Sequence, residues 1–238
     1  MKVIMMHKAS AEDEAGTARP TPELIEGMGR LIGDMQQKGI FVDGDGLRQS
    51  SLGVRINFRG GERHIQPGPF KGSNELVDRY LAVRVRSLDE AIEWATRFVG
   101  DDDAEVDIRP FTEVWDLGLM PKPADDPTTR YMIARKADAR SEAGERESSS
   151  IPGVLGDMGR AGVLLGTERI QPSSKGKRVI YSGGNRTIVD GPFAESKELI
   201  GGYTMIRVDT LDEVLPWLDR FAQCILRDVE VDVRPLYE

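Results

Sequence analysis

The sequence predicts an α+β protein made of two similar halves, and two observations support this fold class. Residues 33–98 match residues 156–221 at a constant offset of 123 positions, with 27 identities in 66 positions. Each half also contains the same succession of strand-like and helix-like segments. Self-similarity over this length indicates that one structural unit occurs twice in tandem.

Each half opens with a short apolar strand that has basic ends, residues 2–8 in the first half and 130–136 in the second. A polar loop follows each strand, and Thr21-Pro22 then has the pattern of an N-cap with proline in the first helical turn. The first helix of each half should end at a glycine, Gly39 or Gly162, because glycine favours the left-handed C-cap conformation. A second strand begins directly after each of these glycines.

A hairpin follows in each half. Paired glycines, Gly60-Gly61 and Gly183-Gly184, separate two strand-like runs and supply the positive φ angles that a two-residue turn needs. Another strand then leads to residues 87–90 or 210–213, which both have the S/T-x-x-E pattern of a helix start. Pro216 should kink the second of these helices or delay its regular part.

A final alternating strand, residues 106–110 or 231–235, closes each half. The resulting order is that of a ferredoxin-like fold with an inserted hairpin. The predicted organisation is a first repeat at 1–111, a linker at 112–129 and a second repeat at 130–238. The linker is rich in proline and aspartate, and we expect its apolar first part to pack against one of the halves.

Composition excludes several classes of function. A formal net charge of −8 argues against nucleic acid as a partner. One cysteine excludes an intramolecular disulfide, and His7 and His64, the two histidines, lack the spacing of a metal site. The first residues are too short an apolar run for a signal peptide or a membrane span. We therefore expect a cytoplasmic protein that needs no metal or other cofactor and binds no membrane.

The most distinctive stretch of the second half runs from Val189 to Tyr203 and contains the turn Gly191-Pro192-Phe193. Its counterpart in the first half contains Gly68-Pro69-Phe70. Proline fixes φ and the phenylalanine can anchor the loop on the core, so these residues are a structural signature.

The run from Asp190 through Gly191-Pro192-Phe193 to Glu198, followed by Gly201-Gly202-Tyr203, resembles the signature of the DGPF-domain proteins within the YCII-related family. The resemblance covers residues 130–238 and, in weakened form, residues 1–111. It implies a dimeric α/β-barrel in which two ferredoxin-like units bring their sheets together. It also implies a bacterial origin and unknown biochemical function. Relatives are often encoded beside extracytoplasmic-function sigma factors, which implies a link to a regulated response.

The two copies of the signature differ in charge. The first copy has Pro67, Gly72 and Asn74 where the second has Asp190, Glu195 and Lys197. A ligand site that needs these charges is therefore complete only in the second half. The candidate ligand-binding residues there are Asp190, Glu195, Lys197, Tyr203 and Arg186, with a carboxylate as a candidate base. Alternatively, Asp190 only caps its own turn.

Two hypotheses about function remain at this point. The first is a protein that binds a small molecule in a cleft of the second repeat, as a simple binder or as a cofactor-independent enzyme. The second is a non-catalytic regulatory or interaction module. In either case the two halves should pair within the chain, and a homodimer is also open.

Overall fold

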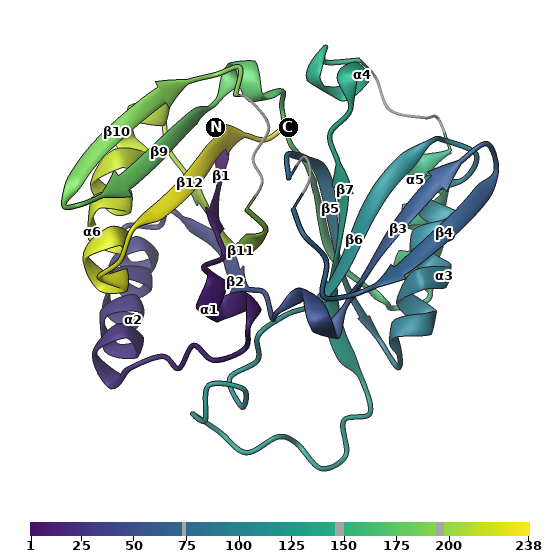
Figure 1. Cartoon of the computed structure of the whole chain (residues 1–238), viewed down its shortest axis with the longest axis horizontal. Coiled ribbons are helices and arrows are strands. Elements are labelled where there is room, and N and C mark those ends of the chain that lie inside the picture. The colour runs from purple at the N-terminus through teal and green to yellow at the C-terminus, as the bar shows by residue number, and fades with distance from the viewer. Residues whose placement is uncertain (73–74, 146–149, 194–197) are drawn as a thin grey trace.

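The computed structural model describes residues 1–72, 75–145, 150–193 and 198–238. Within these ranges the chain is a mixed α+β protein with two antiparallel six-stranded sheets. The sheets face each other, the larger helices cover their outer faces, and the two termini lie close together (Figure 1). No helix in the described ranges combines the length and apolar character needed to cross a membrane.

Sheet I contains strands from both ends of the chain. Its strand order is β10-β9-β12-β1-β11-β2. The strands are β1 (Lys2–Lys8), β2 (Phe41–Gly46), β9 (Lys177–Ser182), β10 (Asn185–Asp190), β11 (Ile200–Arg207) and β12 (Val229–Pro235).

Sheet II contains the strands from the middle of the chain. Its order is β4-β3-β6-β7-β5-β8. The strands are β3 (Val54–Arg59), β4 (Glu62–Pro67), β5 (Val77–Val85), β6 (Ala104–Pro110), β7 (Thr129–Lys136) and β8 (Leu164–Arg169).

Four longer helices lie outside the sheets, and several short ones connect them. α2 (Pro22–Gln37) and α6 (Leu215–Ile225) cover sheet I, while α3 (Leu88–Val99) and α5 (Ile151–Arg160) cover sheet II (Figure 1). The short elements are α1 (Ala11–Glu14), α4 (Ala139–Glu142) and the 3₁₀ turns η1 (Ser50–Leu52), η2 (Ser173–Lys175) and η3 (Leu211–Val214).

The sheets do not follow the division of the sequence into halves. β1 and β2 of the first half lie in sheet I with four strands of the second half, and β7 and β8 of the second half lie in sheet II. The expectation that each half folds into its own sheet is therefore corrected: each opening strand–helix–strand segment is exchanged. The residue bounds of the two repeats stay a prediction.

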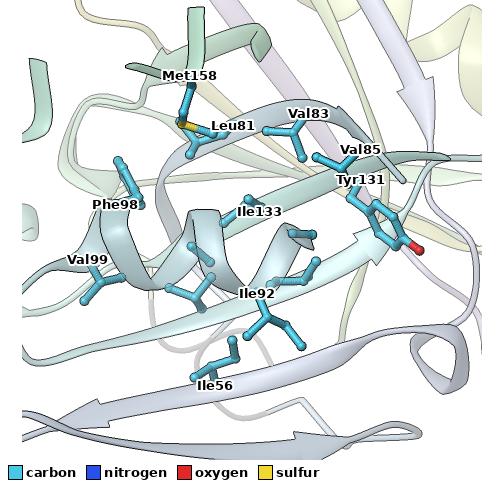
Figure 2. Close-up of a cluster of buried hydrophobic side chains, with 14 of the residues drawn as sticks. Ile56, Leu81, Val83, Val85, Ile92, Phe98, Val99, Tyr131, Ile133 and Met158 are labelled. Atoms are coloured by element: carbon cyan, nitrogen blue, oxygen red, sulfur yellow. The ribbon is translucent and has the colours of Figure 1, made fainter. Parts of the chain in front are cut away.

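The core behind sheet II shows the exchange directly. Ile133 of β7 and Met158 of α5, both from the second half, are fully buried among first-half residues such as Phe98 and Leu81 (Figure 2). Burying one such side chain stabilises a fold by about 1.5–3 kcal/mol. The exchanged segments thus complete a core that the first-half strands alone leave open.

Local sequence signals predicted the elements well. The Thr21 hydroxyl accepts a hydrogen bond from the Leu24 amide, which confirms the predicted N-cap. The paired glycines of both hairpins have φ between 56° and 81°, as their turns require. Pro216 lies in the first turn of α6, and the preceding residues form η3, so the proline delays the regular helix.

A second core fills the space between the sheets. On β1, Ile4 and Met6 face sheet II, whereas Val3 and Met5 face the helices, because side chains alternate along a strand. Two buried arginines also connect the sheets. Arg109 Nη1 of β6 donates to the Ile200 carbonyl at 2.6 Å, and Arg234 Nη1 of β12 donates to the Val77 carbonyl at 2.9 Å.

The segment from 112 to 129 connects the halves along one end of the molecule (Figure 1). It is attached by charge: Arg130 Nε donates to Glu113 at 2.8 Å, and Arg48 pairs with Asp116. The expectation that its apolar residues pack on a half is wrong for four of them. Their exposed fractions are 44% for Val114, 36% for Leu117, 51% for Leu119 and 61% for Met120.

Gly191→Ala is expected to lower the free energy of unfolding by about 1–3 kcal/mol, the usual cost of forcing extra atoms into a packed site. An added Cβ would lie 1.8 Å from the Ser173 carbonyl oxygen, so the backbone must shift. Gly33→Ala is the control, because nothing lies within 4 Å of its added Cβ. Alanine is favoured in helices by about 1 kcal/mol, so this variant should gain stability. Urea unfolding measures both, and an unchanged Gly191→Ala protein would contradict the close approach.

Candidate functional site

Two of the residues expected to bind a ligand lie on the outer, helix-bearing face of sheet I. Arg186 Nη1 of β10 pairs with Asp219 of α6 at 2.6 Å. Asp190 ends the same strand, is 80% exposed and pairs with Lys177 Nζ at 2.8 Å. The two side chains share a face because four residues separate them on one strand.

Tyr203 lies on the opposite face of the sheet. Its ring is 2% exposed, lies in the core between the sheets and stands 5.1 Å from the ring of Tyr80. Its hydroxyl donates to Asp43 Oδ2 at 2.8 Å. Burial raises the pKa of Tyr203, and Tyr80 and Asp43 raise it further, so the phenol stays protonated at neutral pH.

The three predicted site residues that the structure describes, Arg186, Asp190 and Tyr203, therefore do not converge. The sheet separates Arg186 and Asp190 from Tyr203, while Glu195 and Lys197 lie outside the described residues. Ligand binding by any of the five stays untested. The structural signature does have a packing role, because Phe193 and Phe70 are both buried. The backbone amide of Phe193 donates to the Ser173 hydroxyl, and the backbone amide of Phe70 donates to the Ser50 hydroxyl.

What the structure brings together instead is a set of buried charges on the inner faces of the sheets. The first charge cluster comprises Arg55 of β3, Glu75, Asp107 of β6 and Lys136 of β7, and all four residues are less than 10% exposed. Arg55 donates through Nε and Nη2 to the two oxygens of Asp107, at 2.6 and 2.8 Å. Its Nη2 also donates to Glu75 at 2.9 Å.

Lys136 completes the first charge cluster from the other half of the chain. Its ammonium contacts Glu75 and lies 2.8 Å from Asp107 Oδ2. The ring of Phe70 lies 4.6 Å from the guanidinium carbon of Arg55. Each of the two cations thus contacts both carboxylates. Buried charges require such partners, because a buried charge without one is costly.

The second charge cluster is the corresponding group in sheet I and comprises Lys8 of β1, Arg178 of β9 and Asp232 of β12. Arg178 donates to both oxygens of Asp232, at 2.6 and 3.1 Å, and Lys8 Nζ donates to Asp232 Oδ2 at 2.9 Å. The Phe193 ring lies 4.8 Å from the Arg178 guanidinium carbon. The loop signature therefore borders this cluster through Phe193 and not through Asp190.

The cations control the ionisation of the central carboxylates. Burial alone would raise the pKa of Asp232, but Lys8 and Arg178 outweigh burial and hold that pKa below its usual range. Asp107 behaves in the same way beside Lys136 and Arg55. Both carboxylates are therefore ionised at neutral pH.

Glu230 lies next to the second charge cluster. Its Oε1 is buried and 3.1 Å from Arg178 Nε, but accepts no hydrogen bond. Burial raises the pKa of Glu230, against the effect of Arg178 and Lys8. Glu230 is thus a partly buried carboxylate that is easier to protonate than an exposed glutamate.

The described residues contain no group of three or more His, Cys, Asp and Glu side chains arranged to hold a metal ion. Both charge clusters combine cations with carboxylates, and their cations donate charged hydrogen bonds to those carboxylates.

Comparison with known proteins gives the family. A model of the YCII-related domain matches residues 129–224. An uncharacterised protein of Rhizobium meliloti (strain 1021) is 30% identical over 95 residues, which are 40% of this chain and 77% of the relative. The chain belongs to the YCII-related family. No solved structure matches it.

The YCII-related match begins at β7 and ends within α6. The second charge cluster takes Lys8 and Asp232 from outside these residues, and only Arg178 from within them. A search restricted to the signature loop therefore misses it. One signal in the sequence could have found the cluster: the members Lys8, Arg178 and Asp232 have counterparts in Lys136, Arg55 and Asp107 at matching places of the repeat.

Proposed function

We propose that the protein binds a small anionic molecule at the second charge cluster, on the inner face of sheet I. One observation carries the proposal: Lys8 and Arg178, brought together from the two halves, are two buried cations that both donate to the carboxylate of Asp232. Buried cations of this kind form a favourable environment for an anion. The proposal stops at binding, because the cluster's described residues present no nucleophile beside a base.

We also propose that the chain arose by duplication and that each sheet corresponds to a ferredoxin-like unit. Strands related by the sequence offset occupy equivalent places in the two sheets, which supports this history. In this view the exchanged segments replace the second subunit of a dimeric α/β-barrel, so a monomer already contains both sheets. Nucleic acid is not proposed as a partner, because the formal net charge of −8 disfavours contact with phosphate groups.

A thermal-shift screen of small organic anions tests the binding proposal. We expect at least one compound to raise the melting temperature, and Arg178→Lys to weaken its binding roughly 10–100-fold, because the lost charged hydrogen bonds are worth about 1.5–3 kcal/mol. Arg186→Lys, which changes an arginine on the outer face, is the matched control and should leave affinity unchanged. If binding of the compound is lost on substitution of Arg186 or Asp190 instead, the binding site lies on the outer face of sheet I and the proposal is wrong.

A regulatory or interaction module remains the second candidate. The exposed apolar side chains of the connecting segment, Val114, Leu117, Leu119 and Met120, favour this role. Replacing Leu119 and Met120 by serine would leave small-molecule binding intact and remove a protein partner that depends on the segment.

A further inference from the structure

The two charge clusters match in every member except one. Glu75 is 1% exposed in the first cluster, where its two oxygens contact Arg55 and Lys136. The residue 123 positions later is Glu198, which is exposed. A buried carboxylate thus joins the arginine and the lysine in the first cluster, while its sequence counterpart lies at the surface in the second.

The lysines show the consequence of this difference. Lys136 contacts two carboxylates, those of Glu75 and Asp107. Lys8 is 4% exposed on its side chain, and within the described residues its ammonium contacts one carboxylate, that of Asp232. An ammonium has three N–H donors, and a buried donor without an acceptor is costly. Lys8 therefore has the capacity for a further acceptor at the position that corresponds to Glu75.

We infer that this acceptor is the carboxylate of a bound small molecule, and that Glu75 closes the first cluster to such ligands. The inference rests on the function proposed above and names the ligand class. A ligand carboxylate at the second cluster would contact Arg178 and Lys8 as the carboxylate of Glu75 contacts Arg55 and Lys136. Glu75 is in effect a carboxylate ligand built into the chain.

Charge balance favours one carboxylate over a doubly charged anion. Arg55 and Lys136 stand against three carboxylates, because Glu105 lies 3.5 Å from Arg55 in addition to Glu75 and Asp107. The first cluster therefore carries one net negative charge. In the second cluster the ion pairs among the described residues set Arg178 and Lys8 against Asp232 and Glu230, and the charge of the exposed Glu198 also acts on Arg178 and Glu230. Because these carboxylates already supply negative charge, they repel a bound monoanion less than a bound dianion.

Propionate is the probe, because it is the side chain of glutamate as a free acid. At constant ionic strength and neutral pH, propionate should raise the melting temperature of the wild-type protein, and equilibrium dialysis should find one bound propionate per chain. Propionamide, its neutral analogue, and inorganic phosphate should bind at least tenfold more weakly. Equal stabilisation by all three would overturn the inference without requiring any variant.

Glu75→Ala tests the role of Glu75. The variant should lose stability, propionate should restore more of it than in the wild type, and dialysis should find two bound molecules per chain. Glu198→Ala is the matched control and should keep one. Should Glu75→Ala be too unstable to study, Glu75→Ser, which also leaves the carboxylate position empty, replaces it. A count of one in both Glu75 variants, or of two in Glu198→Ala, would overturn the inference.

The outcomes separate this inference from the proposed function. If a screened anion binds at Arg178 but propionate does not, the binding function stands and the carboxylate class is rejected. If neither propionate nor any screened anion binds the wild-type protein, both are rejected. Lys8→Met should reduce propionate binding about tenfold or more, since a charged hydrogen bond is lost.

Discussion

Asp232→Asn is expected to lower the free energy of unfolding by about 3–5 kcal/mol, the usual cost of removing one partner from a buried ion pair. The substitution leaves the buried cations Lys8 and Arg178 without the carboxylate that both contact. Asp107→Asn should cost less, about 1–3 kcal/mol, because Glu75 still contacts Arg55 and Lys136. Guanidinium unfolding at neutral pH measures the difference between the two variants.

Asp190→Asn is the control for this comparison. Asp190 is 80% exposed, and exposed ion pairs contribute at most about 1 kcal/mol, so the variant should remain near the wild type. Equal losses in the Asp107 and Asp232 variants would contradict the difference between the clusters.

The contribution of Asp232 to the free energy of unfolding should also depend on pH. Its folded-state pKa is lowered, so its stabilisation is present above the unfolded pKa of about 4 and disappears as the pH falls through the folded pKa. The gap between wild type and Asp232→Asn should therefore shrink below about pH 4.

The wild-type protein is expected to lose up to about 3 kcal/mol of stability between pH 6.5 and pH 4 through His7. Burial lowers the pKa of His7 to about 4, Arg227 and Lys8 act in the same direction, and Asp13 opposes them. The imidazole packs against Phe221 with 5.3 Å between ring centroids. Below pH 6.5 the unfolded chain takes up a proton that the folded chain excludes until about pH 4, so unfolding is favoured.

Urea unfolding across this pH range tests the effect of His7. His7→Gln should remove the slope between pH 6.5 and pH 4, whatever its stability at neutral pH. His64→Gln, at the other and exposed histidine, is the control and should retain the slope. A wild-type slope that survives in His7→Gln would assign it to carboxylates instead.

Local features could be read from the sequence because they depend on neighbouring residues. The turn at Gly60-Gly61 follows from the φ angles that only glycine adopts easily, and the N-cap at Thr21 follows from one hydroxyl and the next amides. Pro216 delayed α6 for an equally local reason, since proline lacks the amide hydrogen of a helix interior.

The candidate site could be predicted only in part. Alternation along β10 places Arg186 and Asp190 on one face, but the sequence does not say which face meets the helices. Tyr203 lies on another strand, and its face depends on how β11 pairs with β1 and β2. A residue's position in a motif therefore identified the loop but not the groups that share a site.

By itself, the sequence determined the order of strands and helices, the hairpin turns and the recurrence of charged residues in both halves. The tertiary structure decided which sheet each opening strand joins, and so brought Lys8 to Asp232 and Lys136 to Asp107. The physical reason is that a strand can pair with any strand of matching pattern. Which strand it pairs with depends on how much apolar surface the whole core buries. Ile133 is an example, because this second-half residue is buried in the core behind sheet II.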